Sequence, residues 1–95
     1  MNNLGQRLRQ LRKAKDILLR QVATVLDTDT AVVSKFESGK KRPTESQVTK
    51  LAEYYSINKN ELLRLWLCDI VLDSIKDKEQ AIEALELALQ ELKQK

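Results

Sequence analysis

The chain has 95 residues, a net charge of +3 and only four aromatic residues. This length makes one small domain with room for a short extension. No apolar run reaches the roughly 20 residues of a membrane span, and the N-terminus lacks the apolar stretch of a secretory signal. We therefore expect a cytoplasmic protein with no membrane partner. Two glycines and one proline among many Leu, Ala, Glu, Lys and Gln residues favour an all-α fold.

Apolar spacing and capping residues predict six helices. They cover residues 4–15, 19–26 and 30–38, a stretch that begins after residue 44, residues 59–75 and a last stretch after residue 77. Side chains that can cap a helix recur three positions before Glu or Gln, as expected at helix starts. These pairs are Asn3 with Gln6, Thr44 with Gln47, Asn58 with Glu61, and Asp77 with Gln80.

The second and third predicted helices are separated by a tight polar turn. Asp27, Thr28 and Asp29 form this turn, because small polar residues turn readily and can cap the next helix. Apolar residues at helical spacing lie on both sides of it, and the cations of residues 40–42 follow the third helix at once. Two helices joined by a short turn, with cations beside the second, are typical of proteins that place a helix in the DNA major groove.

The charge of the chain is unevenly distributed. Residues 1–50 hold eleven Lys or Arg against five Asp or Glu, whereas residues 51–95 hold six against nine. A basic half suits a polyanion, and an acidic half would be repelled from it. The basic residues gather around the two-helix unit, which favours double-stranded DNA as the partner over ordinary surface variation.

The composition argues against an enzyme or a metal protein. The chain has no histidine, which removes the usual general base and the usual metal ligand. Cys68 is the single cysteine and lies in an apolar stretch, so we expect a buried, unreactive thiol. The carboxylates are scattered, with no glycine-rich phosphate loop near them. We expect no cofactor and no metal.

Residues from about 4 to 63 resemble the Cro and phage-repressor (XRE-type) family of helix-turn-helix domains. The order and spacing of the matching residues agree over roughly two thirds of the chain. The resemblance implies a five-helix, lambda-repressor-like DNA-binding domain, which we expect to cover residues 1–66. The matching positions are Leu8, Leu11, Arg12, Val22, Ala23, Val33, Ser34, Lys35, Phe36, Glu37, Gly39, Pro43, Leu51, Ala52, Glu61 and Leu62.

The resemblance also implies roles for individual residues. Positions matching Thr30, Ala31 and Lys35 touch base edges in relatives, and helical spacing turns Ser34 outward beside them. Because these side chains are mostly small, we expect DNA shape to carry part of the specificity. The positions of Ser38, Lys40, Lys41 and Arg42 are those that grip phosphate in relatives. The positions of Arg12 and Glu37 form an ion pair that ties the first helix to the third.

Three positions depart from the family pattern. Leu19 replaces a glutamine that binds phosphate, and Leu18 replaces a small capping residue. Asp27 stands where glycine is common, in a left-handed position that Asp tolerates better than most residues. Either Leu19 packs against the first helix, or the domain docks on DNA in a slightly shifted pose.

The C-terminal third predicts self-association. Nine of the eleven residues from 62 to 72 are apolar, too many for one helix face, and a helix that is apolar on all sides must be covered on all sides. The last helix adds a seam with coiled-coil spacing. We expect residues 67–95 to be a helical extension that forms a homodimer, although the last helix could instead fold back on its own subunit. The predicted dimer residues are Trp66, Ile70, Ile82, Leu85, Leu89 and Leu92.

The sequence therefore predicts a homodimeric, sequence-specific regulator of transcription that binds a near-palindromic operator, with repression or autoregulation as the expected output. Two alternatives share the fold. One is an antitoxin or a controller of restriction-modification genes, and the other is a protein-interaction module that does not bind DNA. The apolar Leu19 favours the module, whereas the cations at positions 35 and 40–42 favour DNA.

Overall fold

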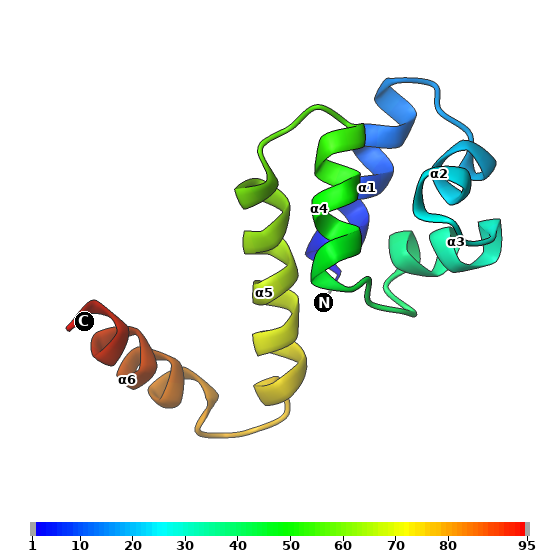
Figure 1. Ribbon diagram of the computed structural model, residues 1–95. Helices are drawn as coiled ribbons and strands as arrows, with labels where there is room; N and C mark the ends of the chain where they lie inside the picture. Colours follow the sequence, from blue (N-terminus) through cyan, green and yellow to red (C-terminus); the bar gives the residue numbers. More distant parts are fainter. Residues whose placement is uncertain (1, 95) are drawn as a thin grey trace.

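The computed structural model describes residues 2–94 and contains six α-helices and no strand within that range (Figure 1). The all-α prediction is confirmed. Five helices form the body of the protein, and the sixth projects from it. The helices are α1 (Asn3–Ala14), α2 (Leu19–Leu26), α3 (Thr30–Ser38), α4 (Glu45–Tyr54), α5 (Lys59–Ile75) and α6 (Ala81–Lys93).

The core lies where the first five helices meet, and each of them contributes buried side chains to it. α1 supplies leucines at positions 4, 8 and 11, a spacing that places all three on one helix face. α4 packs against both α2 and α5. The least exposed large side chains are Tyr55, Leu62, Val22 and Val48.

The capping residues are partly those predicted. Thr44 and Gln47 form the predicted capping box at the start of α4. Three predictions were wrong in detail. Asn2, not Asn3, caps α1; Asn58 accepts from Asn60 N rather than forming a box with Glu61; and Asp77 caps no helix. The Glu61 carboxylate instead binds Arg7 of α1 at 2.7 Å, and this hydrogen bond lowers the pKa of Glu61.

α1 passes unusually close to the end of α3, and Gly5 makes this possible. A Cβ atom at Gly5 would lie 2.5 Å from the carbonyl oxygen of Glu37 and 2.6 Å from that of Phe36. The Asn2 side chain fills the remaining space, accepting from Gly5 N and donating to Glu37 O at 2.9 Å. Glycine is therefore required at position 5 for packing, since only a residue without a Cβ fits there.

α5 joins the body through a carboxylate rather than through apolar packing alone. Asp69 is only 7% exposed, and it accepts hydrogen bonds from Asn3 N, Asn3 Nδ2 and Leu4 N at 2.9–3.1 Å. Asn3 N and Leu4 N are backbone donors that the first turn of α1 cannot pair within the helix, and the helix dipole there also favours a negative charge. A side chain of α5 thus binds the backbone donors in the first turn of α1.

The opposite side of α5 is uncovered. Leu67 and Val71 are 55% and 40% exposed. Cys68 is also exposed, so the prediction of a buried thiol was wrong. The physical reason is that the apolar run in α5 surrounds the whole helix, whereas the body covers one side of it, and Cys68 falls outside that side.

α6 points away from the body and buries none of its residues (Figure 1). The Cα radius of gyration is 15.1 Å, compared with about 12 Å for a compact chain of this length. The alternative in which α6 folds back on its own subunit is not the arrangement in this structure. Its apolar side chains are left open: Ile82, Leu85, Leu87, Leu89 and Leu92 are between 38% and 71% exposed.

Tyr55 makes the stability of the body sensitive to alkali. Burial, reinforced by the nearby Glu37 carboxylate, raises the pKa of Tyr55 well above its ordinary value of about 10. The unfolded chain therefore releases this proton before the folded protein does, and stability falls as pH rises above about 10, by up to about 1.4 kcal/mol per pH unit. Denaturant unfolding between pH 8 and 11 measures this loss. Tyr55→Phe should reduce it, whereas Tyr54→Phe, the control, should reduce it much less, because Tyr54 is the smallest of the causes that raise the pKa of Tyr55.

Candidate nucleic-acid interface

α2, the turn and α3 form the predicted two-helix unit. Asp27 ends α2 in the left-handed region, with φ of 54°, and Thr28 N donates to Ala23 O at 2.9 Å. Asp29 caps α3 by accepting from Val32 N at 3.0 Å. The turn therefore uses its two aspartates differently, one for a backbone conformation that Asp tolerates and one for a cap.

α3 divides cleanly into an inner and an outer face. Val33 and Phe36 are 2% and 3% exposed and hold the helix against the body. The four residues predicted to face DNA bases, Thr30, Ala31, Ser34 and Lys35, are all exposed. The first two stand at the start of the helix, and the other two lie about one turn further along the same helix. The structure thus leaves this outer face free for a partner.

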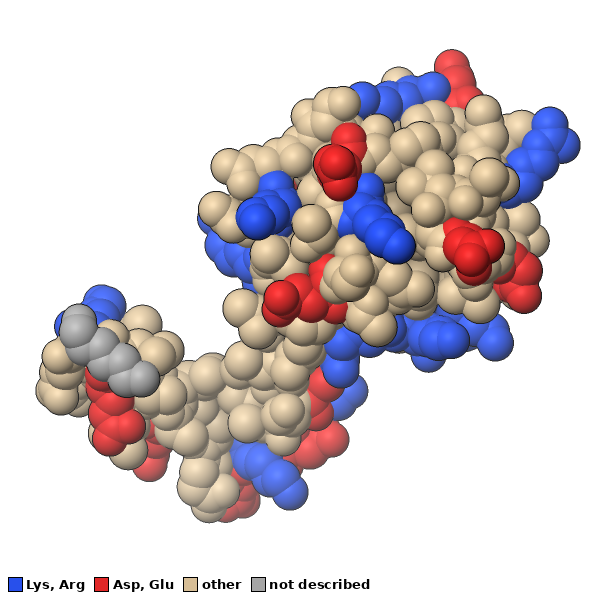
Figure 2. Space-filling view, viewed as in Figure 1, with Lys and Arg blue, Asp and Glu red and all other residues tan. Residues whose placement is uncertain are grey.

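The cations in the segment after α3 differ in whether another side chain of the protein binds them. We call residues 39–43 the basic loop; it begins at Gly39, which ends α3 with φ of 82°. Ser38, Lys40 and Lys41 are exposed, and Ser38 Oγ donates to Lys35 O at 3.3 Å. Arg42, in contrast, pairs with Asp73 of α5 at 2.5 Å. In Figure 2, Lys and Arg gather along the edge of the body beneath α3.

Arg12 and Glu37 join α1 to the end of α3, as the resemblance implies. Arg12 Nε lies 2.8 Å from Glu37 Oε2, and Nη2 lies 3.1 Å from Oε1, so the contact is bidentate. Arg12 Nη1 also donates to Ile17 O at 3.0 Å. Both side chains are largely buried, and the bond to Glu37 raises the pKa of Arg12 above its ordinary value. The pair therefore fixes the end of α3 on α1.

The unusual leucines at the start of α2 behave differently from each other. Leu19 is half-buried and packs against the core. Leu18 occupies the capping position without a side-chain hydrogen bond and is 50% exposed. Gln21 compensates by accepting from Leu18 N at 2.7 Å. Of the two leucines, Leu18 is therefore the one that places an apolar side chain on the surface at the start of α2.

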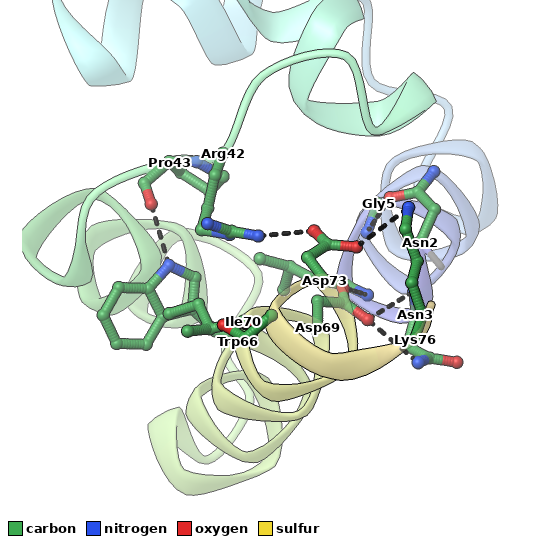
Figure 3. A network of polar contacts seen from close by, with 12 residues as sticks. Asn2, Asn3, Gly5, Arg42, Pro43, Trp66, Asp69, Ile70, Asp73 and Lys76 are labelled. Carbon is green, nitrogen blue, oxygen red and sulfur yellow. Dashed lines mark hydrogen bonds and ion pairs between the residues drawn. The ribbon is translucent and has the colours of Figure 1, made fainter. Parts of the chain in front are cut away.

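Sequence reasoning missed a polar stripe on α5. Trp66, Asp69 and Asp73 are three and four residues apart and so share one helix face (Figure 3). Trp66 Nε1 donates to Pro43 O of the basic loop at 2.8 Å, Asp69 binds the start of α1, and Asp73 binds Arg42. The available signal was the aspartate at position 69, because a carboxylate inside an apolar helix needs buried partners.

The residues predicted for a dimer contact lie in two regions. Trp66 is half-buried against the core and hydrogen-bonded to the basic loop, and Ile70 is half-buried on α5. The four α6 residues of the prediction are exposed. The expected division between residues 66 and 67 falls within α5, which continues to Ile75.

Residues 2–94 contain no helix with the length and apolar character needed to cross a membrane. The same residues contain no group of His, Cys, Asp or Glu side chains that could hold a metal ion.

Comparison with known proteins matches the part of the chain that carries the family resemblance, from α1 to the start of α5. The family model described as a helix-turn-helix domain matches residues 3–65, which span α1 to α4 and the start of α5. The chain is also similar to a protein of Bacillus subtilis (strain 168) named "Uncharacterized HTH-type transcriptional regulator RghRB", with 33% identity over 64 residues. That alignment covers 66% of this chain and 46% of the relative, so the chain matches about half of the relative's length. With its α2–turn–α3 unit and an exposed outer face on α3, this chain belongs to the helix-turn-helix domain family, in its XRE-like form.

Proposed function

We propose that this protein binds double-stranded DNA as a homodimer and regulates transcription, with α3 as the recognition helix. The observation that carries the proposal is the outer face of α3, where Thr30, Ala31, Ser34 and Lys35 are exposed beside the free cations of the basic loop. A helix presented in this way fits the major groove, and nearby lysines bind phosphate. The name of the Bacillus subtilis relative supports transcription regulation.

Within this proposal, the outer face of α3 contacts bases, and the residues at its end and in the basic loop contact phosphate. Lys35 donates to guanine O6 or N7, and the methyl groups of Thr30 and Ala31 contact thymine methyl groups. Ser38, Lys40 and Lys41 bind phosphate and fix the register. Arg42 is the fourth residue of this set, but it must first leave Asp73. The output that we propose is repression or autoregulation of the genes beside the operator.

The dimer in this proposal uses the C-terminal extension. The DNA-binding unit extends to Ile75, because Asp69 holds α5 to α1, and α6 is the association helix. A second copy covers the apolar stripe on α6 made by residues 82, 85, 89 and 92, together with the open side of α5 at Leu67 and Val71. Two recognition helices would then meet successive major grooves about 34 Å apart.

Salt dependence of binding tests the DNA contact. We expect the protein to bind random duplex DNA weakly and its selected operator tightly, with affinity falling steeply as salt rises. Lys41→Ala should lower the slope of log K against log salt by about 0.9, the value for one phosphate contact. Lys35→Ala should flatten the preference for bases at one position of each half-site. Fluorescence anisotropy over a salt series measures the slope, and selection from a random duplex pool measures the preference.

Lys59→Ala is the matched control, because Lys59 is an exposed lysine at the start of α5. Figure 1 shows α5 on the opposite side of the body from α3. It should leave the slope and the base preference unchanged. Equal effects of Lys59→Ala and Lys41→Ala would show that only the overall charge matters. A wild-type protein that binds no duplex at low salt would favour the alternative of a protein-interaction module.

A further inference from the structure

The basic loop is held to the body on both sides of Arg42. Before it, Lys41 N donates to Lys35 O of α3 at 3.2 Å. After it, the buried Pro43 accepts from Trp66 Nε1 of α5 at 2.8 Å. The backbone at Arg42 is therefore fixed between the recognition helix and α5.

Asp73 is the partner that Arg42 finds within the chain. Arg42 Nη2 lies 2.5 Å from Asp73 Oδ2, and the residues come from segments 31 positions apart (Figure 3). One turn earlier on the same face of α5, Asp69 is buried and bound to α1, which fixes the position of Asp73. Asp73 therefore presents its carboxylate to the basic loop from a firmly held helix.

The same contact is weak enough to be exchanged. The two side chains are 41% and 39% exposed, and an ion pair at such a solvent-exposed position is worth little. Lys76 Nζ lies 3.8 Å from Asp73 Oδ1, so Asp73 keeps a cation beside it when Arg42 leaves. Arg42 and Lys76 are the cations that the described residues place against Asp73.

We propose that Asp73 competes with DNA phosphate for Arg42, and so sets how tightly the protein binds DNA. This inference rests on the proposed DNA-binding function. In free protein the Arg42 guanidinium is neutralised by Asp73, and in the complex it turns to a phosphate, for which its planar fork of donors is well suited. Asp73 is a positioning residue in this scheme: it touches no DNA but lowers affinity by holding a phosphate ligand. Its removal should strengthen binding, the opposite of what loss of a structural support would do.

A double-mutant cycle tests the proposal. Asp73→Asn keeps the shape of the side chain and should tighten DNA binding about three- to fivefold when Arg42 is present. In a chain that carries Arg42→Gln, the same substitution should change affinity less than about twofold, because only the loss of a distant negative charge remains. Anisotropy titrations with operator duplex at one fixed salt concentration measure all four proteins, and thermal unfolding checks that each is folded.

Asp77→Asn is the control for charge alone, since Asp77 is exposed, lies four residues further along and changes the net charge equally. It should have the same small effect with and without Arg42. Weaker binding by Asp73→Asn, or an equal gain in the Arg42→Gln chain, would overturn the inference while leaving DNA binding intact. If wild type, Asp73→Asn and Asp77→Asn all fail to bind duplex DNA, the proposed function fails and this inference fails with it.

Discussion

Replacing Gly5 with alanine is expected to destabilise the protein by about 3 kcal/mol or more, which corresponds to a fall in melting temperature of about 10–20 °C. The new Cβ would meet the carbonyl oxygens of Glu37 and Phe36 at 2.5 and 2.6 Å. These are backbone atoms at the end of α3, so relief requires α1 and α3 to move apart. Such a movement would also stretch the Arg12–Glu37 pair. Denaturant unfolding followed by circular dichroism measures the loss.

The sign of this effect is informative. In an open helix position, glycine to alanine stabilises by roughly 0.5–1 kcal/mol, because alanine has the better helix propensity. Gln10→Ala, at an exposed position of the same helix, is the control and should change stability by less than about 0.5 kcal/mol. Adding Asn2→Ala to Gly5→Ala removes the flexible neighbour but should not restore stability. A Gly5→Ala protein as stable as wild type would show that α1 and α3 do not cross as closely as described.

Breaking the apolar stripe of α6 is expected to produce the largest loss of DNA affinity. Leu89→Glu places a charge in the proposed dimer contact, so the protein should sediment as a monomer and bind its operator about 10²–10⁴-fold more weakly. The reason is that two linked recognition helices bind their half-sites with a high effective concentration, which separate monomers lack. Sedimentation velocity and anisotropy titration measure the two consequences independently.

Leu87 offers a matched control for this prediction. It is 58% exposed, against 53% for Leu89, and the two residues lie about 200° apart around the same helix. Leu87→Glu makes the same chemical change on the other face and should leave both mass and affinity as in wild type. If wild type is already a monomer, or if both variants remain dimers, the assignment of this stripe to the dimer is wrong.

The helices were predictable because their apolar residues follow helical periodicity and their ends carry caps. The outer face of α3 followed from the same periodicity, since Val33 and Phe36 had to point inward. The direction of α6 did not follow, because an apolar stripe specifies that a surface is covered but not by which molecule. The exposure of Cys68 was missed for a related reason: apolar neighbours along the chain say nothing about which side of α5 the body covers.

The polar stripe on α5 was hidden for a different reason. Asp69 and Asp73 find their partners 66 and 31 residues away, at Asn3 and Arg42. No local pattern reports a contact over such a separation. The family resemblance covers α1 to the start of α5, so it carried the Arg12–Glu37 pair but ended before these aspartates. Arg42 was consequently expected to bind phosphate, and its ion pair with Asp73 in the structure was not anticipated.

The bond between Asp69 and the start of α1 has a consequence for biosynthesis. The first helix leaves the ribosome early, yet its N-terminal amide groups acquire their anion only after residue 69 has emerged. Until then the backbone donors in the first turn of α1 lack their carboxylate partner, and the core is incomplete. Acquisition of the native state therefore waits for the second half of α5. A fragment that stops at residue 66 lacks the Asp69 carboxylate, which binds the first turn of α1.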